Sequence, residues 1–400
     1  MSMIKKPIPE LRQLNIGFVR LTDSAPLIVA REKKFFRNHG LDVELKRESS
    51  WASIRDKLAT GLLDAAQMLA PMPLAAKLGL ENLNSPFITG LMLSLNGNGI
   101  TLASGLSRRM ALNPATAHQP QATARALKQL LDKTARTLTF ATVYPFSMHT
   151  FQLRQWLESG GIQPSEDVKF IVLPPEQMVE HLARGAIDGF CVGEPWNTLA
   201  VQAGVGEVMA TGYDIWNNAP EKVLAVLEPW HETHPSTHLA MRMAIMEAQA
   251  WLSEPGHREE VVKLLASPCY LDLPAQAITP SLLGHFQYRK NGPCIPKPDF
   301  HVFHRYHAGF PWRSRAEWLL LRIHEMLKKP LDHSRVCPLI KDVFRTDLYR
   351  QAAQHLGLKS PSVDSKSEGT QGTVHRLEKN IELGPDLILD NRQFDPVCAY

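Results

Sequence analysis

Hydrophobic and polar positions near the start of the chain follow two alternating periods. Residues 15–20 form an apolar run, and residues 42–48 alternate valine and leucine with charged side chains, which is the period of a strand. Residues 25–37 follow a Thr-Asp-Ser sequence that suits a helix cap, and a second helix is expected from Trp51, where apolar positions recur at helical spacing. The order strand, helix, strand, helix predicts a parallel sheet covered by helices.

A short sequence in the first half of the chain is nearly repeated in the second. The segment LATGLLD at 58–64 corresponds to LARGAID at 182–188, and Pro71 corresponds to Pro195 at the same offset. In each copy a helix ends at a glycine, an apolar strand follows the aspartate, and a proline stands where the next helix would begin. Two similar α/β units predict two lobes. Where parallel sheets meet across a cleft, strand carboxyl ends and helix amino ends face it, which suits a small anion.

The pattern also divides the chain into segments. Residues 105–136 are irregular and rich in alanine, and we place there the crossing from the first lobe to the second. Residues 229–265 are helical in pattern and are assigned to a return into the first lobe. The predicted division is lobe 1, first part, 14–104; crossover insertion, 105–136; lobe 2, 137–227; return to lobe 1 and C-terminal helices, 228–356; flexible linker, 357–373; C-terminal segment, 374–400.

Composition describes an ordinary globular protein. The 400 residues exceed what one core usually organises, which agrees with two lobes. Hydrophobic residues make up 44% of the chain and charged residues 21%, so both lobes have enough apolar surface for a core. The net charge of +4 is a small excess of 44 basic over 40 acidic residues, and no block of five like charges occurs. Binding of nucleic acid is therefore not indicated.

The cysteines and the first residues of the chain indicate the cellular compartment of the protein. The five cysteines are scattered, odd in number and never spaced as C-x-x-C, which fits a reducing compartment better than a disulfide framework. Lys5 and Lys6 are followed by prolines and charges where a secretory signal needs about 7–15 apolar residues. The longest apolar-looking stretch, residues 62–80, contains Asp64, Gln67 and Lys77 and is too polar for a membrane span. We expect a cytoplasmic protein.

Two candidate binding residues stand at the expected starts of helices. Trp51 directly follows Ser50 and is expected in the first turn of its helix. Its indole either packs across the lobe interface or forms an aromatic wall with an N–H donor beside the cleft, and both can hold at once. His149 comes two residues after the expected cap Ser147, where helix N–H groups lack partners. It is either an ordinary helical histidine or a largely neutral hydrogen-bond donor to an anion, because a helix amino end disfavours further positive charge.

Two more candidates lie in loops or at strand ends. Lys222 precedes the apolar strand 223–227, which we place at the far edge of the second lobe. It is either a surface lysine paired with Glu221 or the positive charge for an anion, whose charge-assisted hydrogen bond contributes about 1.5–3 kcal/mol. Asn98 stands between two glycines and is either a turn residue or an amide donor to the same anion.

Sequence motifs of enzymes are lacking. No G-x-S-x-G, P-loop, H-E-x-x-H or glycine-rich dinucleotide motif occurs. His301, His304 and His307, with Cys294 before them, suggest zinc binding, but the aromatic residues that alternate with them favour a packing segment. We assign no catalytic residue, no metal and no cofactor.

Several longer motifs together resemble the nitrate/bicarbonate-binding family of transporter receptor proteins. The resemblance extends from about Leu14 to Gln351 and resumes at 387–396. It implies a type II periplasmic-binding-protein-like α/β fold, in which two parallel-sheet lobes close over an oxyanion in the cleft between them. The motifs that carry it are LTDSAP at 21–26, SWASIRDKL at 50–58, DGFCVGEPW at 188–196, IW at 215–216 and PEK at 220–222.

The resemblance also implies a set of ligand-binding residues. In the nitrate-binding branch the ligand is held by a tryptophan, a glutamine, a histidine and a lysine. By matching motifs these positions are Trp51, Asn98, His149 and Lys222. Asn98 departs from the pattern, because asparagine keeps the amide donor but is one methylene shorter, and a bridging water could replace its direct contact.

Within that family the chain looks like the cytoplasmic nitrate/nitrite sensors of bacterial nitrate-assimilation operons. The resemblance implies that it sequesters an RNA-binding antiterminator of the ANTAR type and releases it when nitrate or nitrite binds. Nitrate donates no hydrogen bond, whereas the hydroxyl of bicarbonate needs an acceptor such as a carboxylate. Glu221 is the nearest carboxylate, but alternation along a strand is expected to turn it away from Lys222, which favours nitrate.

Two alternative functions remain open on the sequence. The first is a substrate-binding receptor of a nitrate or bicarbonate ABC transporter. The second is an enzyme on the same fold, similar to the thiamine-pyrimidine synthases, which is disfavoured because no cysteine cluster occurs in the chain.

Overall fold

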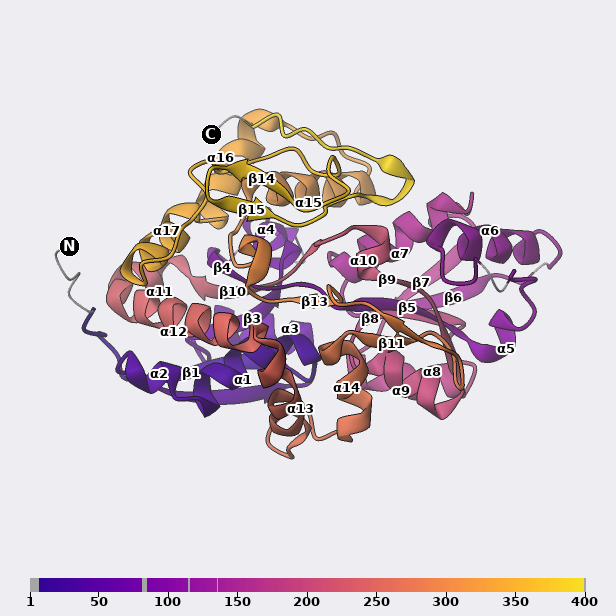
Figure 1. Cartoon of the computed structure of the whole chain (residues 1–400). Helices are drawn as coiled ribbons and strands as arrows, with labels where there is room; N and C mark the ends of the chain where they lie inside the picture. Colours follow the sequence, from indigo (N-terminus) through magenta and orange to yellow (C-terminus); the bar gives the residue numbers. More distant parts are fainter. Residues whose placement is uncertain (1–6, 81–84, 114–115, 135, 399–400) are drawn as a thin grey trace.

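Two mixed sheets covered by helices form the two lobes of the molecule (Figure 1). The computed structural model describes residues 7–80, 85–113, 116–134 and 136–398. The first sheet has the order β13-β4-β10-β3-β1-β2 and the second β7-β6-β8-β5-β9. The strands are β1 Gln13–Val19, β2 Asp42–Glu48, β3 Ala65–Leu69, β4 Phe87–Asn96, β5 Asn98–Ala103, β6 Leu138–Thr142, β7 Val168–Val172, β8 Gly189–Gly193, β9 Gly206–Thr211, β10 Pro220–Leu227 and β13 His301–Val302.

Helices connect the strands and cover both sheets. In the first half these are α1 Ala25–Glu32, α2 Phe35–Asn38, α3 Trp51–Ala59, α4 Pro71–Lys77, α5 Ser104–Ser107, α6 Pro120–Leu131, α7 Met148–Ser159, α8 Met178–Ala183, α9 Trp196–Ala203 and α10 Gly212–Ile215. They are followed by α11 Glu228–Thr233, α12 Pro235–Ser253, α13 Arg258–Ala266, α14 Ala275–Leu283, α15 Arg313–Met326, α16 His333–Val343 and α17 Thr346–His355. Two small hairpins complete the fold, β11 His285–Gln287 with β12 Cys294–Pro296, and β14 His375–Glu378 with β15 Ile381–Leu383.

Each sheet has a parallel part and an antiparallel part. In the first sheet β1 pairs in parallel with β2 and β3, while β10 and β4 are antiparallel additions. In the second sheet β6 pairs in parallel with β7 and β8, while β5 pairs antiparallel with β8 and β9. The predicted α/β fold with two lobes is therefore confirmed, and the expected parallel pairing holds for three strands of each sheet.

The sequence repeat corresponds to a structural repeat. The units β1-α1-β2-α3-β3-α4 and β6-α7-β7-α8-β8-α9 have the same strand order in their sheets. Gly61 and Gly185 both have positive φ, +73° and +69°, where they end the preceding helix. Asp64 accepts a hydrogen bond from Asn15 N–H at 2.7 Å, and Asp188 accepts one from Thr139 N–H at 2.9 Å. Each repeat aspartate thus fixes the register of its lobe's central parallel strands.

Replacing either repeat aspartate by alanine is expected to destabilise the protein. Asp64→Ala and Asp188→Ala each leave a backbone N–H without its partner, which costs about 1–3 kcal/mol of unfolding free energy. Urea unfolding measures the change. Asp132→Ala serves as the control, because that carboxylate is 57% exposed and pairs with Lys128 on the surface, so a change below about 0.5 kcal/mol is expected. Equal effects of all three substitutions would contradict the prediction.

The chain passes between the lobes at Gly97, which separates β4 in the first sheet from β5 in the second. Asn96 and Gly97 both have positive φ, 60° and 102°, and a Cβ atom at Gly97 would collide with the imidazole of His301. Glycine is therefore required where the chain turns from one sheet into the other. The expected crossing within 105–136 is wrong, because α5 and α6 pack on the second lobe.

The return to the first lobe lies between α10 and β10. β10 pairs with β3 and β4 in the first sheet, so the expected position of Lys222 at the far edge of the second lobe is wrong. The apolar strand that follows Lys222 completes the middle of the first sheet rather than the rim of the second. Lys222 consequently faces the lobe interface from the first-lobe side.

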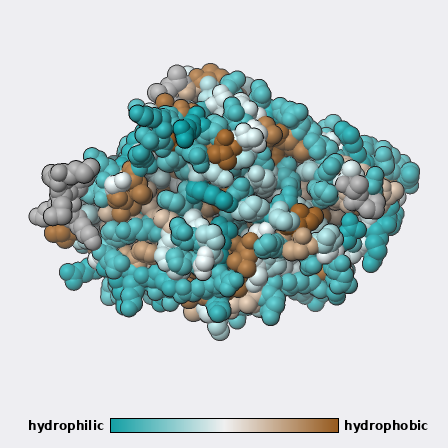
Figure 2. Space-filling model, viewed as in Figure 1, coloured by the Kyte–Doolittle hydropathy of each residue, from teal (hydrophilic) through white to brown (hydrophobic). Residues whose placement is uncertain are grey.

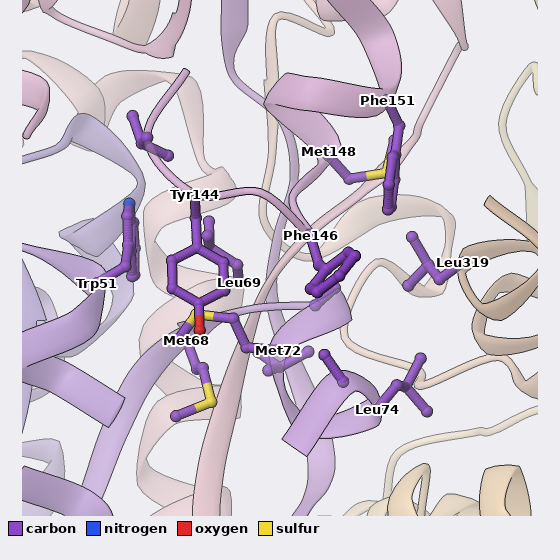
Figure 3. Close-up of a cluster of buried hydrophobic side chains, with 14 of the residues drawn as sticks. Trp51, Met68, Leu69, Met72, Leu74, Tyr144, Phe146, Met148, Phe151 and Leu319 are labelled. Carbon is purple, nitrogen blue, oxygen red and sulfur yellow. The ribbon is translucent and has the colours of Figure 1, made fainter. Parts of the chain in front are cut away.

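Apolar side chains from both lobes form one continuous core across the interface (Figure 3). Met68, Leu69 and Met72 of the first lobe lie close to Tyr144 and Phe146 of the second. A backbone hydrogen bond also crosses the interface, from Thr22 N–H to the Glu194 carbonyl at 2.8 Å. The two lobes are therefore closed on each other.

The segment 357–373 is held by ion pairs, so the prediction of a flexible linker is wrong. Asp364 pairs with Arg313 and Arg350, and Lys366 pairs with Glu368 at 2.6 Å and with Asp386 at 2.7 Å. Composition suggested a linker because the segment is rich in serine, threonine, lysine and glycine and contains no aromatic residue. Its polar side chains instead find buried partners of opposite charge, which hold it against α15 and α17.

Cysteine pairing also differs from the expectation. Cys337 of α16 and Cys398 form a disulfide with a Cα–Cα distance of 5.4 Å, while Cys191, Cys269 and Cys294 are free thiols. The two sulfurs meet although 61 residues separate them in the sequence, a proximity that spacing alone does not reveal. No helix within the described residues is both long and apolar enough to cross a membrane. The face drawn in Figure 2 is mainly hydrophilic, with hydrophobic residues in small separate groups.

Candidate functional site

The four predicted binding residues come from four different elements, and all of them face the lobe interface. Trp51 is the first residue of α3 and His149 the second of α7. Asn98 is the first residue of β5, and Lys222 lies near the start of β10. All four side chains are at most 1% exposed. The first lobe contributes the indole and the ammonium group, and the second contributes the amide and the imidazole.

Local sequence explains how the two helices begin at the site. Ser50 caps α3 by accepting a hydrogen bond from Ser53 N–H at 3.1 Å, and Ser147 caps α7 by accepting one from Thr150 N–H at 3.2 Å. Both helices therefore direct their amino ends, and the partial positive charge of those ends, toward the interface.

Glu221 joins the four predicted residues into one cluster. Its Oε1 lies 2.6 Å from Lys222 Nζ and 3.7 Å from His149 Nε2. Its Oε2 accepts a hydrogen bond from Asn98 Nδ2 at 2.6 Å. Lys222 Nζ also lies 5.4 Å from the centre of the Trp51 ring, within the range of a cation–π contact. The structure thus brings together all four residues that the sequence selected.

The expectation that Glu221 faces away from Lys222 is wrong. The pairing of β10 with β4 shifts register between Pro220 and Lys222, and again between Lys222 and Val223. Such an irregularity breaks the strict alternation of a strand and lets consecutive side chains reach the same site. Nothing in the alternating pattern signals it, although a proline and two opposite charges at a strand start are compatible with one.

Three more polar residues belong to the site and were not selected from the sequence. Asp23 Oδ2 lies 2.8 Å from Lys222 Nζ, and its Oδ1 accepts a hydrogen bond from Gln67 Nε2 at 2.6 Å. Gln152 Oε1 accepts a hydrogen bond from Asn98 Nδ2 at 3.0 Å. Asp23 follows the carboxyl end of β1, where ligand-binding residues of α/β folds gather, and this position was the available signal.

Burial sets the charges of the cluster. Burial and the neighbouring ammonium of Lys222 hold the pKa of His149 well below its usual range, so the imidazole is neutral. Burial raises the pKa of Glu221 to about 7, although Lys222 favours its ionised form. Burial disfavours the charge of Lys222, but the carboxylates of Asp23 and Glu221 outweigh it and raise the pKa of Lys222 above its ordinary value. The ammonium therefore keeps its charge.

Several buried polar atoms of the cluster have no hydrogen-bond partner among the described residues. They include the indole Nε1 of Trp51, both ring nitrogens of His149 and Oδ1 of Asn98. A buried donor without a partner costs roughly 1–3 kcal/mol. A small ligand with several acceptor atoms would satisfy the indole and imidazole N–H groups together. The cluster thus combines an ammonium group, paired with the carboxyl groups of Asp23 and Glu221, with neutral N–H donors from both lobes.

The histidine segment after β12 does not form a metal centre in the described part of the chain. His301 is buried, stacks at a centroid distance of 5.6 Å on Phe303, and lies against Gly97. Among the described residues, the only group of three close metal-ligand side chains consists of His333, Cys337 and Cys398. The aromatic packing that the alternating pattern favoured for His301 is confirmed.

Comparison with known proteins finds relatives that are named for nitrate import and for nitrate binding. It is 40% identical over 350 residues to the nitrate import ATP-binding protein NrtC of Synechocystis sp., a match that covers 86% of this chain and 50% of NrtC. The chain thus spans about half the length of the first curated relatives it matches. It is 31% identical to the nitrate/nitrite binding protein NrtA of Synechococcus elongatus, covering 98% of this chain and 88% of that protein.

A solved structure and a family model agree with these relatives. The crystal structure of the periplasmic nitrate-binding protein NrtA from Synechocystis superposes with a TM-score of 0.85 at 29% identity, covering 97% of this chain and 96% of that one. The model of the NMT1-like family matches residues 8–266, which include all of the site residues named above. Both the sequence match and the shared two-lobed architecture lead to one assignment. The chain belongs to the NMT1-like family.

Proposed function

We propose that this protein binds nitrate, or another small monovalent oxyanion, as a ligand-binding receptor rather than an enzyme. The observation that carries the proposal is the buried cluster of Lys222, Trp51, His149 and Asn98 between the lobes. Nitrate is planar, carries one negative charge and only accepts hydrogen bonds, so an ammonium group and neutral N–H donors suit it. The similarity to proteins named for nitrate import and nitrate binding supports the same ligand.

The position of the cluster explains how a ligand would change the protein. Trp51 and Lys222 belong to the first lobe, and Asn98 and His149 to the second. An anion that contacts both pairs stabilises the closed arrangement and not an open one. Binding therefore shifts the population of the two arrangements by the difference in affinity between them.

The protonation state of Glu221 affects whether the site prefers nitrate or bicarbonate. In its protonated form the side chain carries no charge that repels an anion, whereas its ionised form accepts a hydrogen bond from the hydroxyl of bicarbonate. Because burial raises the pKa of Glu221 to about 7, the protonated form is well populated at and below neutral pH. We therefore place nitrate before bicarbonate.

A thermal-shift series tests the proposal. The full chain is heated with nitrate, nitrite, bicarbonate, chlorate or sulfate at increasing concentration. A true ligand at 100 times its Kd adds about 2.7 kcal/mol to the unfolding free energy. Nitrate is expected to give the largest shift, and the doubly charged sulfate none. Unfolding temperatures unchanged by every anion would refute the proposal, and a larger shift with bicarbonate than with nitrate would change the ligand.

Removing the indole donor should weaken nitrate binding without removing the aromatic wall. Trp51→Phe keeps a ring beside Lys222 but deletes the Nε1 donor, which has no protein partner. The loss of one hydrogen bond to a charged ligand is expected to raise the nitrate Kd about tenfold or more, that is by about 1.5 kcal/mol. Isothermal titration calorimetry measures it. Trp230→Phe, which also deletes an unpartnered Nε1 but outside the site, should leave the Kd unchanged.

A second role for the same site is sensing, and its support is the motif resemblance described in the sequence analysis. The relatives named for nitrate import and nitrate binding support the receptor role first. We propose, as the second candidate, a cytoplasmic nitrate/nitrite sensor that holds an ANTAR-type antiterminator and releases it when the lobes close on the ligand. Co-purification with such an antiterminator, abolished by millimolar nitrate, is the expected result. A complex that persists in nitrate, or none at all, would leave only the receptor role.

A further inference from the structure

A second cluster of reactive side chains lies at the C-terminal end of the chain, away from the anion site. His333 and Cys337 are four residues apart on α16, so both project from the same face of the helix. Cys398 comes from the other end of the C-terminal region and meets Cys337 in the disulfide. One ligand atom from each of the three residues lies within 4.8 Å of those of the other two. Figure 1 shows the C-terminus beside α16.

A buried carboxylate stands beside this cluster. The Glu317 side chain on α15 is 1% exposed, and its Oε1 lies 3.7 Å from His333 Nδ1. The same carboxylate accepts hydrogen bonds from Val397 N–H at 2.8 Å and from Cys398 N–H at 3.1 Å. His333 Nδ1 is buried and has no hydrogen-bond partner. Glu317 therefore already holds the segment that carries Cys398, and its carboxyl group lies beside the imidazole.

We propose that the dithiol form of this cluster is a Zn²⁺ site. Two thiolates and one imidazole are ligands that zinc prefers in tetrahedral geometry, and a helical i, i+4 pair supplies two of them from one rigid element. Glu317 stands beside His333 as the carboxylate that orients a metal-bound histidine. A water molecule or Glu317 itself completes the fourth position. Two thiolates on one zinc ion lie about 3.7 Å apart, so the site needs only a small separation of the two sulfurs.

The disulfide and the zinc site exclude each other, because both use the sulfur atoms of Cys337 and Cys398. A phosphine reductant and one water convert the disulfide to two thiols and the phosphine oxide. Each thiol then loses a proton as its sulfur binds Zn²⁺, so two protons are released for each ion. The imidazole binds as the neutral base. In the disulfide form and in the zinc-bound form Cys398 is attached to α16, whereas the metal-free dithiol lacks this link.

The link acts on a C-terminal segment that contacts both lobes. We define the C-terminal strap as residues 386–398. Within it, the Leu387 carbonyl accepts a hydrogen bond from Asn217 N–H at 2.9 Å, and Arg392 pairs with Glu158 of α7 at 3.4 Å. Leu389 packs into the core of the second lobe, while Cys398 is fixed to α16 on the first. Zinc or the disulfide therefore anchors a strap that reaches α7, the helix that carries His149.

Metal titration of the full chain tests the site. The protein is reduced with the phosphine, freed of reductant without air, and titrated with Zn²⁺, and in parallel with Co²⁺, whose thiolate charge-transfer absorption reports the ligands. One equivalent of metal per reduced chain is expected, with none bound by the oxidised chain. Glu317→Gln should weaken zinc binding about 10–100-fold, and urea unfolding of that variant shows whether it is folded.

Matched cysteine variants separate the site from other thiols. Cys337→Ser and Cys398→Ser should abolish stoichiometric metal binding and the Co²⁺ thiolate band. The double variant Cys269→Ser, Cys294→Ser removes two exposed free thiols and should retain both. A reduced wild-type chain that binds no more metal than Cys337→Ser would overturn the proposal. So would a Co²⁺ thiolate band that is lost in the Cys269, Cys294 double variant.

Discussion

Lys222→Met is expected to abolish the nitrate-dependent increase in stability and to lower the unfolding free energy of the free protein by about 3–5 kcal/mol. The ammonium is completely buried between Asp23 and Glu221, at 2.8 and 2.6 Å. Its removal leaves two carboxylates that repel an anion and each other. It also deletes the only full positive charge among the residues that form the cluster. Calorimetric titration with nitrate and urea unfolding measure the two effects.

A second variant distinguishes the loss of the binding charge from a simple loss of folding. Lys222→Met combined with Glu221→Gln removes one charge of each sign and is expected to recover part of the lost stability, because a neutral amide replaces an unpaired carboxylate. It should still bind nitrate at least tenfold more weakly than the wild type, since the charge-assisted hydrogen bond of about 1.5–3 kcal/mol is missing.

Lys366→Met is the matched control for Lys222. That lysine is also buried, with 6% of its side chain exposed, and also pairs with two carboxylates, Glu368 and Asp386. Its loss should lower stability while the nitrate Kd stays unchanged. Nitrate binding that survives in Lys222→Met, or that disappears equally in Lys366→Met, would contradict the assignment of Lys222 to the site.

Nitrate affinity is expected to fall as pH rises above about 7, by up to tenfold per pH unit. The cause is Glu221, whose pKa burial raises to about 7. Below that pH the side chain is neutral and does not repel the anion, and above it the carboxylate does. The pKa of His149 is held well below its usual range by burial and Lys222, so histidine titration does not account for this change. Titrations between pH 5.5 and 8.5 measure it.

The same group makes the free protein less stable as pH rises. The pKa of Glu221 is raised on folding from 4.5 to about 7, so the folded state binds more protons than the unfolded state in that window. Unfolding free energy therefore decreases between pH 4.5 and 7, by about 3 kcal/mol at most, and is constant with respect to this group above pH 7.

Two variants separate the contributions to the pH profile. Glu221→Gln should bind nitrate with an affinity that no longer depends on pH in this range. Burial also raises the pKa of Glu194 to about 7, so Glu194→Gln should flatten part of the stability profile while the pH dependence of nitrate binding remains. A nitrate Kd that is constant with pH in the wild type would refute the role given to Glu221.

The sequence predicted well those features that depend on local pattern or on a family motif. The repeat around Asp64 and Asp188 predicted two equivalent lobes because the same short-range interactions recur in both. The four residues Trp51, Asn98, His149 and Lys222 were found through motif and position at element starts, and the structure brings them together. Their role in ligand binding stays a prediction.

Features that depend on long-range pairing were not predictable from the same patterns. The crossing at Gly97 was missed because β4 and β5 are continuous in the sequence, and only their pairing with different sheets distinguishes them. The orientation of Glu221 was predicted wrongly because a register shift breaks the usual alternation. The ordered segment 357–373 and the Cys337–Cys398 pair depend on partners far away in the sequence.

The place where the backbone changes lobes has a mechanical consequence. Asn98 directly follows Gly97, and Glu221 and Lys222 directly follow the second crossover. Rotation of one lobe about these two connections would move such residues little, while side chains at the outer rim, such as the Arg20–Glu176 ion pair, would travel far. The proposed anion site lies close to the axis of this rotation. We therefore expect rim substitutions to change the affinity through the free energy of lobe opening, without any contact with the ligand.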